Sequence, residues 1–313
     1  MPLEGGARGR FSTPVASVRV RTTVVVVGSR PRSTHALGRT GFVFPPPRDR
    51  ASLRTALVLG ALAVACLFAI LAAVRWGSTP LSFGAVVDAL LGRGDEATRT
   101  IVRELRLPRV AQAALVGAAL ATSGTALQAL LRNPLAEPYV LGISSGAAVG
   151  AIATVIFGVA VGSAGMGASA AVGATLALLV VLAIARAVGG TLDPRTLVLA
   201  GVIVAAFLNA LLLLALVTVD LERYRSAMFW LLGSNAGADW RNVASLALVS
   251  AAGLAWLVAR GRALDALALG EETARHLGVP AGRVRLEVLL VASVLTAASV
   301  SVAGTVGFVG LVV

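Results

Sequence analysis

Long uncharged segments separated by short charged ones dominate the pattern of this sequence. Five of them are apolar runs, at 55–74, 110–131, 196–219, 242–259 and 288–302. Most approach the length of about 20 residues with which an α-helix crosses the hydrocarbon core of a bilayer. The uncharged stretch 138–185 is too long for one helix, and its glycine-rich centre at 158–169 predicts a break between two helices. The pattern therefore predicts seven membrane spans.

The polar segments between these spans differ in character. Within 75–109, the stretch 81–92 has helical apolar spacing and is expected to lie at the membrane surface. The segment 186–195 is predicted to be a loop, and 220–241 a polar connector with an apolar insert. The segment 260–287 is a long charged loop, and we interpret it as cytoplasmic.

A short amphipathic helix is predicted within this loop, at 264–278. Its acidic residues precede its basic ones, an order that suits the helix dipole, and a glycine followed by a proline supplies a stop. The residues that would define the helix as a docking element are Gly270, Glu271, Glu272, Ala274, Arg275, His276, Leu277 and Gly278. Such a helix could dock into a groove on a soluble partner; an ordinary solvated surface helix is the alternative.

The first 50 residues have a composition unlike the rest of the chain. They hold nine arginines against Glu4 and Asp49, and they lack the apolar core of a signal peptide. We predict a disordered, arginine-rich extension at 1–50, followed by a membrane domain at 51–313. Binding of nucleic acid or anionic lipid by these arginines is the alternative, and we expect no nucleic-acid partner.

Composition sets the class of protein and excludes several kinds of chemistry. The chain is 57% hydrophobic and 13% charged, whereas soluble domains carry about 25% charged residues. We therefore expect an all-α, polytopic helical bundle in a membrane. All 27 basic residues are arginine, so the lysine of a P-loop is missing and no standard ATP site is expected. Cys66 stands alone, and the two histidines lack metal-ligand spacing, so neither a metal site nor a cofactor is expected.

The uncharged spans bear on the source of energy for transport. Carriers coupled to protons usually place an ionisable group inside the membrane, and these spans hold none. We therefore expect the energy source to lie on another chain, with sodium coupling through backbone carbonyls as the alternative. Gln112 and Gln128 could line a translocation pathway or form hydrogen bonds between helices, and the sequence leaves both open.

Loop charge gives a weak indication of orientation. With the N-terminus in the cytoplasm, Arg132, the 186–195 loop and the 260–287 loop share the cytoplasmic side. The loops on the two sides of the membrane hold nearly equal numbers of arginines. The arginines of the N-terminal extension favour this orientation.

Several motifs carry a resemblance to a known family. They are RLPR at 106–109, GAALATSGTALQALLRNPLAEPYVLGISSGA at 117–147, LAG at 199–201, FWLLGS at 229–234, LALGEETARHLGV at 267–279 and AGTVGFVGLVV at 303–313. In this order and spacing the chain resembles the permease subunits of bacterial ABC importers for iron-siderophores, haem and vitamin B12. The resemblance covers 52–313.

The resemblance implies a function and a set of partners. It implies uptake of a metal chelate, with a ferric siderophore favoured, across the cytoplasmic membrane, without enzymatic activity in this chain. The implied partners are an ABC ATPase, a substrate-binding protein and a second permease copy, identical or different. The part of the predicted helix around Glu271 to Leu277 would then be the coupling helix that docks on the ATPase.

The resemblance also assigns roles to residues at the two ends of the second span. Arg106 and Arg109 match outward arginines that pair with acidic residues of the binding protein, and Pro108 would start the helix. Anchoring of these arginines to phospholipid headgroups is the alternative. At the other end, Asn133 and Pro134 are expected to form a turn that sets the packing of two spans, because proline cannot continue a helix. Contact of this turn with the ATPase is the alternative.

The chain departs from the family pattern at both ends. The family has ten spans, and we count seven and part of an eighth before Val313. We therefore expect a chain truncated at its C-terminus, and the arginine-rich extension has no counterpart in the family. A remnant that does not transport is the corresponding alternative.

Overall fold

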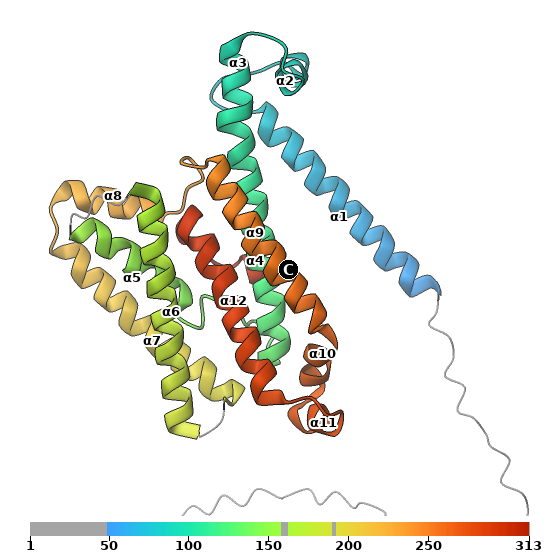
Figure 1. Ribbon diagram of the computed structural model, residues 1–313, viewed down its shortest axis with the longest axis vertical. Helices are drawn as coiled ribbons and strands as arrows, with labels where there is room; N and C mark the ends of the chain where they lie inside the picture. Colours follow the sequence, from blue (N-terminus) through green and yellow to red (C-terminus); the bar gives the residue numbers. More distant parts are fainter. Residues whose placement is uncertain (1–48, 158–161, 190–191, 313) are drawn as a thin grey trace, which may run out of the picture. The chain divides into compact units, whose positions relative to one another are not determined.

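The computed structural model describes residues 49–157, 162–189 and 192–312, and these residues form helices joined by short loops, with no strand among them (Figure 1). The predicted disordered extension at 1–50 lies almost wholly outside the described residues. Residues 57–313 make up one compact unit. The helices are α1 (Asp49–Arg75), α2 (Phe83–Leu90), α3 (Glu96–Thr100), the π-helix η1 (Ile101–Arg106), α4 (Leu107–Leu131), α5 (Ile143–Ile156), α6 (Gly162–Gly189), α7 (Pro194–Val217), α8 (Leu221–Leu231), α9 (Trp240–Ala259), α10 (Gly261–Leu269), α11 (Glu271–His276), α12 (Ala281–Ala303) and α13 (Val309–Val312).

Six helices within the described residues are long and apolar enough to cross a membrane, and α5 is a shorter apolar helix. Together they correspond to the seven predicted spans, and the prediction of an all-α polytopic bundle is confirmed. Helix α12 is central to the bundle, because it contacts α4, α5, α6 and α9 (Figure 1). Its residues Val288, Leu289 and Val300 are fully buried.

The second span begins earlier than predicted. We expected it to start at Val110 with Pro108 at the helix start, but a continuous helix runs over Glu96–Leu131. Proline inside a helix lacks an N–H group, and its ring clashes with the carbonyl four residues earlier. The π-helix just before it removes that conflict, because the Leu107 N–H bonds to the carbonyl of Val102, five residues back.

The same π-helix leaves one carbonyl for another helix to satisfy. In the i→i+5 register the N–H of residue 108 would bond to the carbonyl of Arg103, and a proline has none. The indole N–H of Trp240, at the first position of α9, donates to that carbonyl at 3.1 Å. An irregularity in one helix thereby fixes the start of another.

We predict that Trp240→Phe weakens this junction. The substitution keeps an aromatic ring but removes the donor to Arg103, which should lower the free energy of unfolding by about 1 kcal/mol. Thermal unfolding of the purified protein in detergent would measure the effect. Trp76→Phe is the control, since that ring is 64% exposed; equal losses in both variants would contradict a specific role for the Trp240 indole.

Two connectors differ from their prediction. The third span starts only at Ile143, because 132–142 forms an irregular loop whose Leu141 is fully buried. The predicted connector at 220–241 contains the helix α8, capped by the Asp220 carboxylate, which accepts from the Arg223 N–H at 3.0 Å. The N-terminal half of α8 is charged and its C-terminal half contains Phe229 and Trp230. The sequence therefore indicated a polar connector with an apolar insert rather than a helix.

Glycines allow α5 and α6 to pack with their backbones in contact. A Cβ added at Gly173 would lie 2.1 Å from the carbonyl oxygen of Gly146, and one added at Gly150 would lie 2.1 Å from that of Ser169. No side chain fits in these places. Small residues at such crossings are the usual means of packing helices in membranes, where apolar side chains gain little by leaving lipid.

Candidate functional site

The predicted amphipathic helix is two helices, α10 and α11, which meet at Gly270. This glycine has a φ of 130°, a conformation that side chains rarely adopt. Helix α10 buries Leu264 and Leu267 against the bundle. Helix α11 buries Ala274 and leaves Leu277 65% exposed. The prediction of one continuous helix at 264–278 is therefore wrong, because the left-handed region at Gly270 interrupts the hydrogen-bond ladder.

The first turn of α11 is held by a shared carboxylate. Glu271 accepts from Arg275 at 2.7 Å through one oxygen and from Arg285 of α12 at 3.2 Å through the other. The hydrogen bond from Arg285 holds the pKa of Glu271 below its usual range, and the charge of Arg275 adds to this. A lowered carboxylate pKa stabilises the fold at neutral pH, and this contribution is lost as the pH falls through that pKa.

The end of the bundle that carries α11 gathers the loops that the charge analysis placed on one side. Arg285 donates to the carbonyl of Leu192 in the connection from α6 to α7, at 2.5 Å. Gly270 lies against the Arg132 guanidinium at the end of α4. The grouping of the 260–287 loop, the 186–195 loop and Arg132 on one side is thus confirmed.

The chain turns where α4 ends. Arg132 adopts the left-handed conformation with a φ of 49°, and the side chain of Asn133 accepts from the Leu135 N–H at 2.9 Å. Pro134 follows and does not continue the helix. The turn directs the chain into the 136–142 loop, which leads to α5 and buries Ala136 and Leu141.

The two arginines predicted to dock a binding protein lie in different surroundings at the opposite end of α4. Arg106 is 8% exposed, and its guanidinium donates to the carbonyls of Val74, Arg75 and Thr79. Arg109 is exposed and makes one hydrogen bond, to the carbonyl of Ala236 at 3.0 Å. A docking role stays a prediction for both, and Arg106 could serve a partner only by giving up internal bonds.

The two glutamines join helices and loops. Gln112 is fully buried, and its amide nitrogen donates to the Asn235 side chain at 2.9 Å and to the Val302 carbonyl at 3.1 Å. The amide of Gln128 donates to the carbonyl of Gly310 at 2.9 Å. The sequence left open whether these glutamines line a pathway or form hydrogen bonds between helices, and the structure shows such hydrogen bonds. A pathway role stays a prediction, and in this conformation Gln112 faces no open passage.

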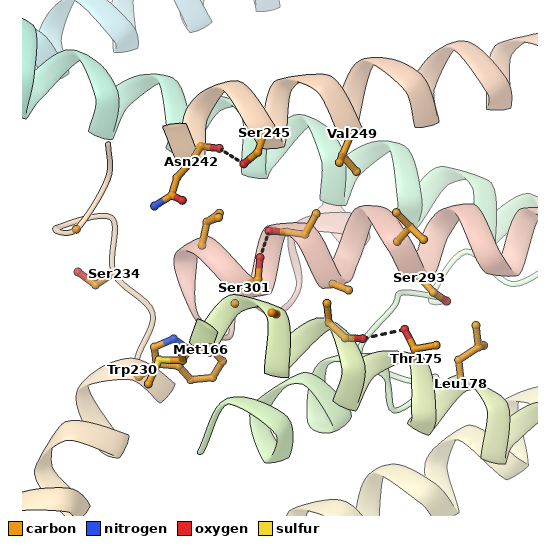
Figure 2. Close-up of a pocket in the computed structure, with 18 of the residues that line it drawn as sticks. Met166, Thr175, Leu178, Trp230, Ser234, Asn242, Ser245, Val249, Ser293 and Ser301 are labelled. Atoms are coloured by element: carbon orange, nitrogen blue, oxygen red, sulfur yellow. Dashed lines mark hydrogen bonds between the residues drawn. The ribbon is translucent and has the colours of Figure 1, made fainter. Parts of the chain in front are cut away.

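The sequence did not single out the residues that line a cavity with several polar groups in its wall. This cavity of about 790 Å³ lies between α6, α8, α9 and α12 (Figure 2). Hydroxyl groups line it, but Thr175, Ser245 and Ser301 each donate to a carbonyl of their own helix. Such groups present a weakly polar wall without charge. The sequence signal for it is the recurrence of serine and threonine on α12, which the apolar pattern conceals.

Within the described part of the chain, no group of three or more His, Cys, Asp or Glu side chains could hold a metal ion. The polar groups of the cavity wall are hydroxyls and the amide of Asn242, beside the indole of Trp230 and the thioether of Met166. Any ligand accepted there would be selected by shape and weak hydrogen bonds.

These features define a class: a multi-pass helical membrane protein with a short helix pair displayed at one end of the bundle. The chain belongs to the FecCD transport family, whose model matches residues 65–313.

The known proteins similar to this chain include two import permeases and one solved transporter structure. It is 42% identical over 236 residues to a cobalamin import system permease of Halobacterium salinarum, covering 75% of this chain and 61% of that protein. It is 37% identical over 267 residues to a vitamin B12 import system permease of Shigella boydii, covering 85% and 78%. A solved structure described as an inward-facing conformation of a metal-chelate type ABC transporter matches with a TM-score of 0.72 and 28% identity, covering 82% of this chain and 79% of that one.

Proposed function

We propose that the chain is the membrane permease subunit of an ABC importer for a corrinoid or an iron chelate, powered by a separate ATPase. The observation that carries the proposal is α11, a short helix that is anchored at Glu271 and exposed along its other face. Short helices of this kind suit a groove on a soluble partner. The family and the relatives named for vitamin B12 import support the same substrate class.

The proposal assigns each end of the bundle a partner. The α11 end would face the cytoplasm and the ATPase, with Glu272, His276 and Leu277 on the exposed surface. The opposite end would receive a substrate-binding protein, with Arg109 as the exposed arginine free to meet a carboxylate. A second permease copy would complete the passage, and the hydroxyl-lined cavity would form part of its wall. The protein would reside in the cytoplasmic membrane of a bacterium.

Uptake into proteoliposomes tests this function. The full chain would be reconstituted with its ATPase and binding protein, and uptake of cobalamin and of a ferric siderophore would be followed with and without ATP. We expect ATP-dependent uptake of one of them. Uptake driven by a sodium gradient without the ATPase would instead identify a secondary carrier, and no uptake under any condition would refute a transport role.

Co-purification tests the assignment of α11. Leu277→Asp should prevent the ATPase from co-purifying with the permease, because it places a charge in the proposed contact. Leu91→Asp at the end of α2 is the matched control, since Leu91 is 62% exposed and Leu277 65% exposed. Retention of the ATPase by the Leu277 variant, or its loss from both variants, would count against docking at α11.

A further inference from the structure

Arg285 is a buried cation, and burying its charge costs free energy that packing alone does not offset. Its side chain is 5% exposed, near the start of α12. Removing an arginine from water is expensive, and an apolar residue of similar size would often serve stability as well or better. Its contacts therefore point to a role in joining other parts of the chain.

Those contacts reach two elements that lie far apart along the chain. One guanidinium nitrogen, Nη2, donates to Oε2 of Glu271 in α11 at 3.2 Å. The other, Nη1, donates to the carbonyl of Leu192 at 2.5 Å. One rigid, planar group thus spans from the first turn of α11 to the connection before α7.

The contact at Leu192 lies two residues before the start of α7. The next residue, Asp193, caps that helix, and its carboxylate accepts from the N–H groups of Arg195 at 3.0 Å and Thr196 at 3.3 Å. Leu192 itself is 8% exposed. A displacement of the Leu192 carbonyl is therefore passed directly to the capped end of α7.

The contact at Glu271 is equally specific. Within the described residues, no other side-chain hydrogen bond of α11 reaches another helix, since the bond from Arg275 stays inside α11. The other ion pair of α12 joins Glu287 to Arg260 at 3.0 Å and touches neither α11 nor α7. The chain thus offers a second, more exposed ion pair of the same helix for comparison.

We propose that Arg285 is a positioning residue that links α11 to the start of α7, so that a partner that moves α11 also moves α7. The inference rests on the proposed function, which supplies the partner. In that setting the ATPase displaces α11, and Arg285 carries the displacement to α7, a membrane-spanning helix.

Distances measured in the permease alone test the link without any partner. Spin labels would be placed at Thr273→Cys in α11 and Arg195→Cys in α7, in a Cys66→Ser background that removes the only native cysteine. We expect a narrow distance distribution that broadens in Arg285→Met. Glu271→Ala, a change at a 37% exposed side chain, should broaden it as well and guards against misfolding of the first variant. Glu287→Gln should leave it narrow. Unchanged distributions in both test variants would overturn the link.

The assembled importer tests whether the link matters for transport. Arg285→Met and Glu271→Ala should keep ATP hydrolysis but lower the ratio of substrate taken up to ATP hydrolysed by roughly tenfold. Glu287→Gln should keep the wild-type ratio. Loss of folded protein would lower uptake and hydrolysis together, so the ratio separates positioning from stability. An unchanged ratio would overturn the role in transport. If the wild type shows no ATP-dependent uptake, the proposed function fails, and the spin-label distances still decide whether Arg285 links α11 to α7.

Discussion

Gly173→Ala should leave little folded protein after extraction into detergent. The added Cβ would lie 2.1 Å from the carbonyl oxygen of Gly146 and 3.0 Å from the Cα of Gly150. Both atoms belong to the backbone of α5, so no side chain can turn away to make room. Overpacking a core typically costs 1–3 kcal/mol, and a backbone clash of this size should cost at least about 3 kcal/mol.

Thermal unfolding followed by size-exclusion chromatography would measure this loss. Gly117→Ala in α4 is the matched control, because a Cβ there meets no atom within 4 Å. That variant should be neutral or slightly more stable, since alanine favours a helix over glycine by about 1 kcal/mol. If the two variants melted alike, the crossing of α5 and α6 would be looser than the structure has it.

Arg106→Met should be the most damaging change among the arginines at its end of α4. It would leave the carbonyls of Val74, Arg75 and Thr79 without their donor in a largely buried position. Unsatisfied buried groups cost about 1–3 kcal/mol each, and water can reach some of them, so we expect a total loss of about 3 kcal/mol.

Arg109→Met provides the comparison, three residues away on the same helix. Its single hydrogen bond is exposed, so the free energy of unfolding should change by less than about 1 kcal/mol. Under the proposed function this variant should instead bind the substrate-binding protein more weakly, which a pull-down would detect. Equal stability of the two variants would show that the Arg106 bonds do not hold the end of α1.

The sequence predicts the spans well because hydropathy alone decides which segments can lie in a membrane. It predicts their ends poorly, because tertiary contacts decide those. Pro108 resembles a helix start, yet the π-helix before it and the Trp240 indole allow the helix to continue. At 264–278, apolar spacing continues through Gly270, whose backbone conformation ends α10.

The candidate site shows the same limit at the level of side chains. Arg106 and Arg109 are chemically identical and three residues apart, but only the folded chain reveals that one is turned inward. Arg285 carries no sequence signal as a link, because its two partners lie 14 and 93 residues away along the chain. The hydroxyls of the cavity wall are likewise hidden inside apolar spans.

The π-helix at Ile101–Arg106 also bears on how chains of this kind can change in length. Deleting one residue there would restore an uninterrupted α-helix, and it would rotate everything before it by about 100°. The carbonyls of Val74, Arg75 and Thr79 all precede the π-helix, so they would turn away from the Arg106 guanidinium that donates to them and secures the end of α1. An apparent repair of the helix would release the segment that it supports. The extra residue of the π-helix therefore sets the direction in which Arg106 points around the helix axis, relative to the segment before it.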